Sequence, residues 1–390
     1  MNRMEHPDSA SFRASAQRVA LNRRDFLRTA GLLGAGAPLL GFQPLRAAVR
    51  SRGHKVVVVT FGGGARDEET FAPDGQENIP HLIDTLLPQA TFYSQVVNRG
   101  ILGHYVATAS LATGAYETFD NFAATPPANP TVFEYYRKAL HRPAADAWVV
   151  APSNGFNRIG ESDARGFGAG LGAGVILPKH LLAAAMPQHQ HSAFTHLLRD
   201  NYEDPYSAPE LKGGEFELSQ LDSILKLSVS EFTQHALSLS SADELSVFIA
   251  HQLMRQLAPS LLWITLHDMD VAHSGAYSLY VDGIRRSDRL CAEIWQMIQA
   301  EPEYAGRTTM LVLPDFGRDS DFDAGGNGFQ HHRTGDALSR TTWMMTLGPG
   351  VRQGAMIDRP VQSTDLVPTI GALMGFDTPR AQGRALTEVV

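Results

Sequence analysis

The sequence predicts an α/β protein, a sandwich of helices around a mostly parallel β-sheet. Short apolar runs alternate along the chain with longer segments of helical periodicity. The apolar runs lack the polar alternation of a sheet that has one face in water. The 390 residues are 43% hydrophobic and 19% charged, which supplies a sizeable core and excludes a disordered or fibrous chain.

Each predicted strand is a short β-branched or otherwise apolar run. The first, Lys55–Phe61, reads K-V-V-V-V-T-F and ends in three glycines. The other predicted strands are Thr91–Val97, Trp148–Ala151, Ser260–Leu266, Thr309–Leu313 and Thr342–Leu347. Ligands of open parallel sheets bind beyond the carboxyl ends of the strands, so we expect the functional residues directly after these runs.

Helices are expected between the strands, where apolar residues recur at helical spacing. The predicted helices are Ile79–Leu87, Tyr105–Thr113, Thr131–Leu140, two helices within 216–257 of which the second is Ala242–Gln256, Tyr280–Gln299 and Asp365–Met374. The stretch around 153–215 is rich in glycine and histidine and is interpreted as an insertion. Its uneven histidine spacing favours a solvated loop over a metal-binding tract, at His180, His189, His191 and His196.

Residues 1–50 have the features of an export signal. Arg23 and Arg24 are followed by Phe26, Leu27 and an apolar run rich in glycine and alanine, the order found in twin-arginine signals. The run is too short and too glycine-rich for a stable membrane span, and the alternative is a basic amphipathic helix. We therefore expect the export machinery as a partner, a periplasmic or extracellular location, and one folded domain over 51–390.

Charge and cysteine content exclude several classes of protein. The formal net charge is −8, and without residues 1–50 the chain holds 25 basic and 38 acidic residues, a net −13. This balance argues against a nucleic-acid partner. Cys291 is the only cysteine, which rules out an internal disulfide framework and multi-cysteine metal sites. With fifteen histidines, any metal site would use nitrogen and oxygen ligands.

Two strand ends carry residues that could bind a metal. After Ser260–Leu266 comes H-D-M-D-V-A-H, in which Asp268, Asp270 and His273 could meet one cation of zinc, manganese or iron. The alternative is a helix N-cap formed by one of the two aspartates. After Thr309–Leu313 comes P-D-F-G-R-D with Asp315, and further on the adjacent pair His331 and His332, one of which could reach the same metal.

These segments together resemble the alkaline-phosphatase superfamily, which includes sulfatases and phosphonate hydrolases. The resemblance covers most of residues 55–376. It rests on V-V-V-V-T-F-G-G-G, S-L-A-T-G at Ser110–Gly114, the D-x-D-x-x-H block, P-D-F-G, the late histidine, and D-L-V-P-T-I-G-A-L-M-G. The resemblance implies a three-layer sandwich and a hydrolase of small anionic esters, in which metal ions clamp the phosphoryl or sulfuryl group.

The resemblance carries over unevenly to single residues. One metal site is matched by Asp268 or Asp270, by His273, and by His331 or His332, with Asp315 in support. The second site is eroded, because the first-strand aspartate of the family falls on Gly62 and a histidine of the family falls on Phe316. Asp67, Glu68 or Glu69 could supply the missing carboxylate.

The position of the family's nucleophile falls on His104, where a cysteine, serine or threonine is expected. His104 could bind a metal or attack, or Thr108 or Ser110 could be the nucleophile after a small shift. The sequence contains no C-x-P-S-R motif, which excludes maturation to formylglycine. We therefore expect an exported hydrolase of phosphate or sulfate esters with a divalent cation and a reduced, one-metal site. The alternative is a non-catalytic exported relative that acts as a binding protein.

Overall fold

The computed structural model describes residues 53–123, 125–186, 192–200, 218–321 and 326–390. The predicted export signal at 1–50 lies outside the described residues, and so do His189 and His191. No described helix combines the length and the apolar character that a membrane crossing requires.

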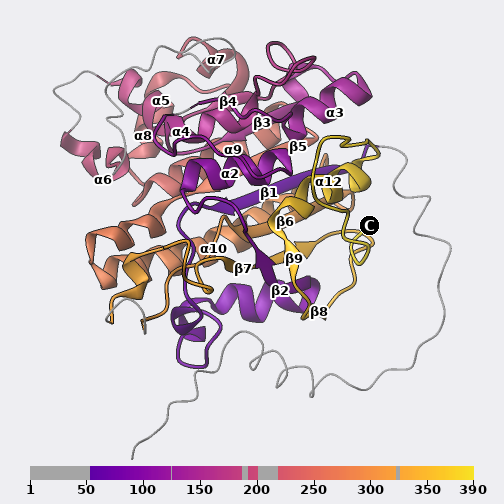
Figure 1. Cartoon of the computed structure of the whole chain (residues 1–390). Coiled ribbons are helices and arrows are strands. Elements are labelled where there is room, and N and C mark those ends of the chain that lie inside the picture. Colours follow the sequence, from indigo (N-terminus) through magenta and orange to yellow (C-terminus); the bar gives the residue numbers. More distant parts are fainter. Residues whose placement is uncertain (1–52, 124, 187–191, 201–217, 322–325) are drawn as a thin grey trace, which may run out of the picture.

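One mixed sheet lies at the centre of the protein, between layers of helices (Figure 1). Its strands follow the order β4-β3-β5-β1-β6-β7-β2-β8, and β9 also pairs with β2. The strands are β1 (Lys55–Phe61), β2 (Thr91–Val97), β3 (Ala147–Val150), β4 (Gly174–Ile176), β5 (Leu261–Leu266), β6 (Thr308–Pro314), β7 (Thr341–Leu347), β8 (Ala355–Ile357) and β9 (Val361–Gln362). From β4 to β6 all neighbours are parallel, whereas β7 runs antiparallel to both β6 and β2.

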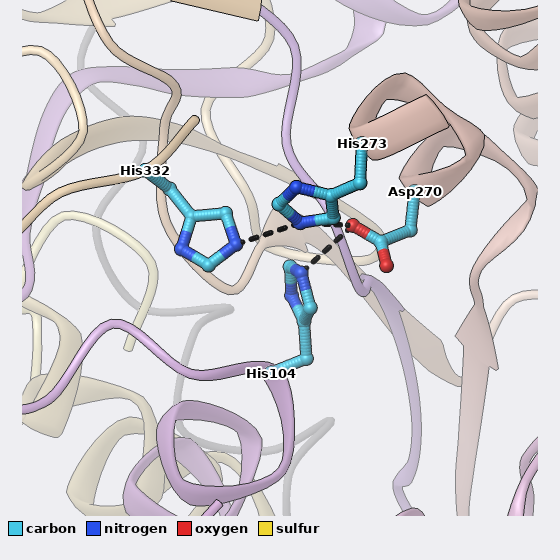
Figure 2. A group of neighbouring side chains, drawn as sticks. All are labelled: His104, Asp270, His273 and His332. Atoms are coloured by element: carbon cyan, nitrogen blue, oxygen red, sulfur yellow. Dashed lines mark hydrogen bonds and ion pairs between the residues drawn. The ribbon is translucent and has the colours of Figure 1, made fainter. Parts of the chain in front are cut away.

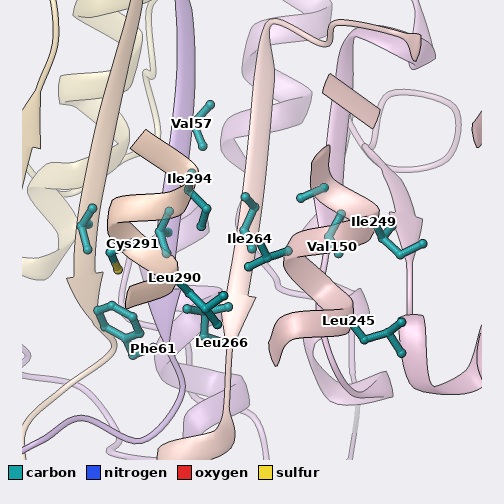
Figure 3. Close-up of a cluster of buried hydrophobic side chains, with 14 of the residues drawn as sticks. Val57, Phe61, Val150, Leu245, Ile249, Ile264, Leu266, Leu290, Cys291 and Ile294 are labelled. Atoms are coloured by element: carbon teal, nitrogen blue, oxygen red, sulfur yellow. The ribbon is translucent and has the colours of Figure 1, made fainter. Parts of the chain in front are cut away.

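The helices cover both faces of this sheet. They are α2 (His104–Thr113), α3 (Val132–Leu140), α4 (Asn154–Asn157), α5 (Pro178–Ala185), α6 (Thr195–Leu198), α7 (Gln220–Leu225), α8 (Val229–Ala236), α9 (Ala242–Gln256), α10 (Tyr277–Ala300) and α12 (Leu366–Met374). Alternate residues of β1 belong to different cores. Val57 belongs to the same buried cluster as residues of α9 and α10, among them Ile249 and Ile294 (Figure 3), and Val58 belongs to the cluster that includes residues of α2, α3 and α12.

The three-layer sandwich and the mostly parallel sheet confirm the predicted fold class. Some local predictions were wrong. The helix expected at Ile79–Leu87 is a π-helical turn over His81–Leu86 followed by a 3₁₀ turn. The tract interpreted as a solvated loop is partly helical, with His180 in α5 and His196 in α6. The strongly periodic helices are close to prediction, and α9 has the predicted bounds.

Candidate metal centre

Four side chains converge beyond the carboxyl ends of β5, β1 and β6 (Figure 2). They come from three segments that are distant in sequence: His104 begins α2, Asp270 and His273 follow β5, and His332 lies in the loop after β6. One ligand atom from each residue lies within 4.8 Å of the others. We refer to His104, Asp270, His273 and His332 as the metal-ligand cluster.

The distances inside the metal-ligand cluster suit a small cation. Asp270 Oδ1 lies 2.9 Å from His104 Nε2 and 3.2 Å from His273 Nε2. The Nε2 atoms of His273 and His332 are 3.0 Å apart. Tetrahedral bonds of about 2.0–2.1 Å to zinc place ligand atoms about 3.3 Å apart, close to these separations. A set of three imidazoles and one carboxylate fits zinc, and also manganese or iron.

A 3₁₀ segment, Asp268–Ser274, places two of the four residues of the cluster. With three residues per turn, Asp270 and His273 lie on the same face. The buried Asp243 of α9 fixes where the segment begins, because its carboxylate accepts hydrogen bonds from the backbone N–H groups of His267 (2.7 Å) and Asp268 (2.9 Å).

The loop after β6 is held by a second buried carboxylate. Asp319 is fully buried, accepts a hydrogen bond from Arg333 N at 2.7 Å, and donates its own N–H to the carbonyl of His331 at 2.9 Å. His331 is exposed, and its neighbour His332 lies in the cluster. The structure thus separates the two histidines that the sequence left as alternatives.

Asp315 orients the His104 ring. Its Oδ2 lies 2.7 Å from His104 Nδ1, and its Oδ1 accepts hydrogen bonds from Phe316 N (2.9 Å) and Gly63 N (3.3 Å). A carboxylate on Nδ1 holds that nitrogen as a donor and directs the lone pair of Nε2 toward a metal, which is the common second-shell arrangement of histidine ligands. The ring of Phe316, 4.8 Å from that of His104 between centroids, forms an apolar wall.

The protonation states of His332 and Asp270 suit cation binding, whereas His104 holds a proton that a metal would have to displace. Burial lowers the pKa of His332 to about 2, so its imidazole is neutral at neutral pH. Burial alone would raise the pKa of Asp270, but the imidazoles around it, His104 first, hold it well below its usual range. Burial alone would lower the pKa of His104, yet the carboxylates of Asp270 and Asp315 raise it to about 9. A metal at Nε2 would therefore displace a proton from His104.

The turn after β1 is crowded by neighbouring side chains. A Cβ at Gly62 would lie 2.7 Å from His267 Cδ2 and 2.9 Å from Phe156 Cζ, so a larger residue there would require these rings to move. A Cβ at Gly63, where φ is +97°, would lie 2.9 Å from a guanidinium nitrogen of Arg318. The position on which the sequence resemblance places the family's first-strand aspartate is therefore crowded in this protein.

Arg318 is fully buried and stabilises the cluster through hydrogen bonds to Asp270 and to two backbone carbonyl groups. Its Nη2 donates to Asp270 Oδ1 at 3.0 Å, its Nε to the carbonyl of Gly64 at 2.7 Å and its Nη1 to the carbonyl of Phe329 at 3.1 Å. The guanidinium thus ties Asp270 to the turn after β1 and to the loop after β6. It also places a permanent positive charge beside the cluster.

The sequence-predicted site residues divide into two groups. His104, Asp270, His273 and His332 come together, and Asp315 stands behind His104. Asp268 instead pairs with Arg286 at 3.0 Å, and His331 faces solvent.

Thr108 lies one helical turn along α2, and its buried hydroxyl has no hydrogen-bond partner among the described residues. Glu69, one of the residues that could have supplied the missing carboxylate, instead pairs with Arg66 and accepts a hydrogen bond from the hydroxyl of Tyr280 at 3.2 Å.

Sequence reasoning missed the supporting residues Arg318 and Asp243. The only signal for Arg318 was a lone arginine directly after P-D-F-G, at a strand end where burial was expected. Asp243 sits in the first turn of α9, where an acidic residue is ordinary and gives no hint of a contact with the loop after β5.

The fold resembles that of several solved hydrolases. A phosphonate monoester hydrolase from Silicibacter pomeroyi matches with a TM-score of 0.52 at 14% identity, over 85% of this chain and 76% of that one. A wild-type alkaline phosphatase matches with 0.52 at 12%, over 86% and 99%. A putative sulfatase from Bacteroides thetaiotaomicron matches with 0.51 at 11%, over 86% and 74%.

The sequence matches no family model and no curated protein. The solved structures establish that this protein has the alkaline-phosphatase fold, as the sequence motifs implied.

Proposed function

We propose that the protein is an exported, metal-dependent hydrolase of phosphate or sulfate esters that works with one divalent cation. The observation that carries this proposal is the metal-ligand cluster, whose four ligand atoms lie within 4.8 Å of one another at the carboxyl edge of the sheet. The His267 ring against Gly62 and the Arg318 guanidinium against Gly63 support a single cation. Export through the twin-arginine route rests on the pattern at Arg23 and Arg24.

His104, Asp270, His273 and His332 would hold the cation. When bound, a divalent cation supplies a Lewis acid that polarises an oxygen of the phosphoryl or sulfuryl group. Asp315 keeps the His104 ring in the tautomer that presents Nε2, and Arg318 and Asp243 keep the loop after β5 in register. His273 is one-third exposed, so a substrate would approach from its side.

Water is the proposed attacking group. His104 is unsuited to attack because Asp315 and Asp270 lie at 2.7 and 2.9 Å from its two ring nitrogens. Thr108 is fully buried inside α2, away from the helix end that meets the cluster. In the hydrolysis, water oxygen forms the new bond to phosphorus or sulfur, the ester P–O or S–O bond breaks, and the leaving alcohol takes a proton.

The test combines metal content with activity. Elemental analysis of the gently purified protein should find about one zinc, manganese or iron per chain, and a panel of phosphate and sulfate esters should reveal metal-dependent turnover. His332→Ala should lose both, whereas the neighbouring His331→Ala serves as the matched control and should keep both. A protein that takes up no stoichiometric metal, even after reloading, would contradict the proposal.

A non-catalytic binding protein is the second candidate. It is favoured by the nucleophile position, which is occupied by His104 instead of a hydroxyl or thiol residue. A metal-loaded protein that hydrolyses no ester of the panel would favour this candidate. Turnover that is abolished by His332→Ala would exclude it.

A further inference from the structure

A pocket lies beside the metal-ligand cluster along the same edge of the sheet. It has a volume of about 180 Å³. Residues that follow three adjacent parallel strands line it: Pro152 after β3, Lys179 after β4, and His267 and Asp268 after β5. The cluster lies beyond β5, β1 and β6, so the two sites meet at the end of β5.

The 3₁₀ segment Asp268–Ser274 forms the partition between the two sites. Asp270 and His273 face the cluster, while Asp268 and Val271, also three residues apart, line the pocket. His267 belongs to both sites, because its ring lines the pocket and its Nε2 lies 3.5 Å from Asp270 Oδ2. The pocket therefore lies next to the cluster, on the other side of His267.

Among the described residues that line the pocket, one arginine lacks an acidic partner, and the lining carboxylate of Asp282 lies 3.9 Å from Arg285. Lys179 pairs with Asp200 at 2.8 Å, and Arg286 pairs with Asp268 at 3.0 Å. The guanidinium of Arg199, which also lines the pocket, has no hydrogen bond or ion pair with any described residue. The N-terminal turn of α9 borders the pocket at Ser241 and adds a partial positive charge.

We propose that this pocket binds the leaving group of the ester and selects leaving groups that carry a carboxylate, with Arg199 as the specificity-determining residue. The inference rests on the proposed hydrolase function and deepens it. A guanidinium presents two parallel N–H donors that match the two oxygens of a carboxylate. A single unpaired guanidinium matches one added negative charge, whereas a second dianionic phosphate would require further free donors.

The first experiment compares two phosphate esters that differ mainly in charge. The probes are 4-carboxyphenyl phosphate and 4-carbamoylphenyl phosphate, given to the metal-loaded full chain. The wild type should have the higher kcat/KM for the carboxylate ester, and Arg199→Gln should lower the ratio of the two kcat/KM values about tenfold. The matched control Arg255→Gln, at an exposed arginine near the far end of α9, should leave the ratio unchanged. An unchanged ratio in Arg199→Gln would overturn the proposal.

A second experiment measures binding without turnover. Calorimetry should show 4-hydroxybenzoate binding the wild type about tenfold tighter than 4-hydroxybenzamide, with that preference lost in Arg199→Gln. Equal affinities in the wild type would overturn the carboxylate specificity even if esters are hydrolysed. If the preference is found but no ester is hydrolysed, the hydrolase function and the leaving-group role fail together, and the carboxylate pocket remains.

Discussion

At the scale of single residues, the clearest test concerns Asp315, which touches the His104 ring rather than the proposed metal. Asp315→Asn keeps the size of the side chain but removes the charge that holds Nδ1 as a donor. Loss of such a second-shell partner weakens metal binding about 10- to 100-fold. Competition of the metal-loaded variant with a chelator measures this change.

Asp146→Asn is the control for that experiment. Asp146 is also a buried aspartate, but it directly precedes β3, at the end of the sheet opposite the cluster. Its substitution should leave metal affinity unchanged. Equal affinities of Asp315→Asn and the wild type would show that His104 is not oriented through Asp315.

A substitution at Gly62 tests how closely the His267 ring packs against the turn after β1. In Gly62→Ala the new methyl group meets the His267 ring at 2.7 Å, and overpacking of this kind costs about 1–3 kcal/mol of stability. The same substitution in a His267→Ala background should cost clearly less, because the ring is gone and only Phe156 remains close. Thermal unfolding of the four proteins of this cycle gives the coupling. Additive effects of the two substitutions would rule out the contact.

At the scale of elements, Asp146 makes the pairing of β3 with β5 sensitive to acid. Its carboxylate accepts hydrogen bonds from Ser260 N and Oγ at 2.9 and 2.8 Å, and from Tyr136 and Arg142. Burial alone would raise the pKa of Asp146, but these hydrogen bonds lower it below 3.8.

A carboxyl group whose pKa is depressed by folding stabilises the native state above its unfolded pKa and loses this effect as it is protonated. Asp146→Asn should therefore lower the free energy of unfolding by about 2 kcal/mol at neutral pH. The difference should shrink as the pH falls through the ordinary value of 3.8. Denaturant titrations at several pH values measure it, and a difference that does not depend on pH would contradict this role of Asp146.

The same scale shows how far the sequence could predict the fold. β1 and β2 have the predicted bounds. In β1 an uninterrupted run of valines can bury both faces of the strand. β8 and β9 have only three and two residues, too few to give a pattern, and they form through pairing with β2. The antiparallel direction of β7 depends on the path of the loop before it, which local sequence does not encode.

The sequence could predict which types of residue form the candidate site. It could not predict which of two nearby aspartates or of two adjacent histidines belongs to it. Asp268 and Asp270 are equivalent by sequence, and the three-residue turn of the segment after β5 decides which faces the cluster. Which of His331 and His332 points toward the cluster depends on the path of the loop after β6. Asp319, twelve or more residues earlier in the chain, holds that loop through hydrogen bonds with the backbone of His331 and Arg333. Which aspartate and which histidine face the cluster depends on tertiary contacts, and local sequence propensity does not determine it.

At the scale of the whole molecule, the metal-ligand cluster connects parts of the chain that fold into different layers. His104 belongs to α2 on one face of the sheet, and Asp270 and His273 immediately precede α10 on the other. His332 comes from the loop between β6 and β7. The unfolded chain cannot present these four ligands together, so a cation should bind the native state almost exclusively.

Metal removal should therefore destabilise the entire fold rather than one loop. A ligand present at about 100 times its Kd stabilises the native state by about 2.7 kcal/mol. Treatment of the wild type with a chelator should lower its Tm by several degrees, and one equivalent of zinc should restore it. The Tm of His332→Ala should not respond to either treatment, while His331→Ala should respond like the wild type. If His332→Ala loses as much stability on chelation as the wild type, His332 does not bind the stabilising cation. That cation would then be bound elsewhere in the protein.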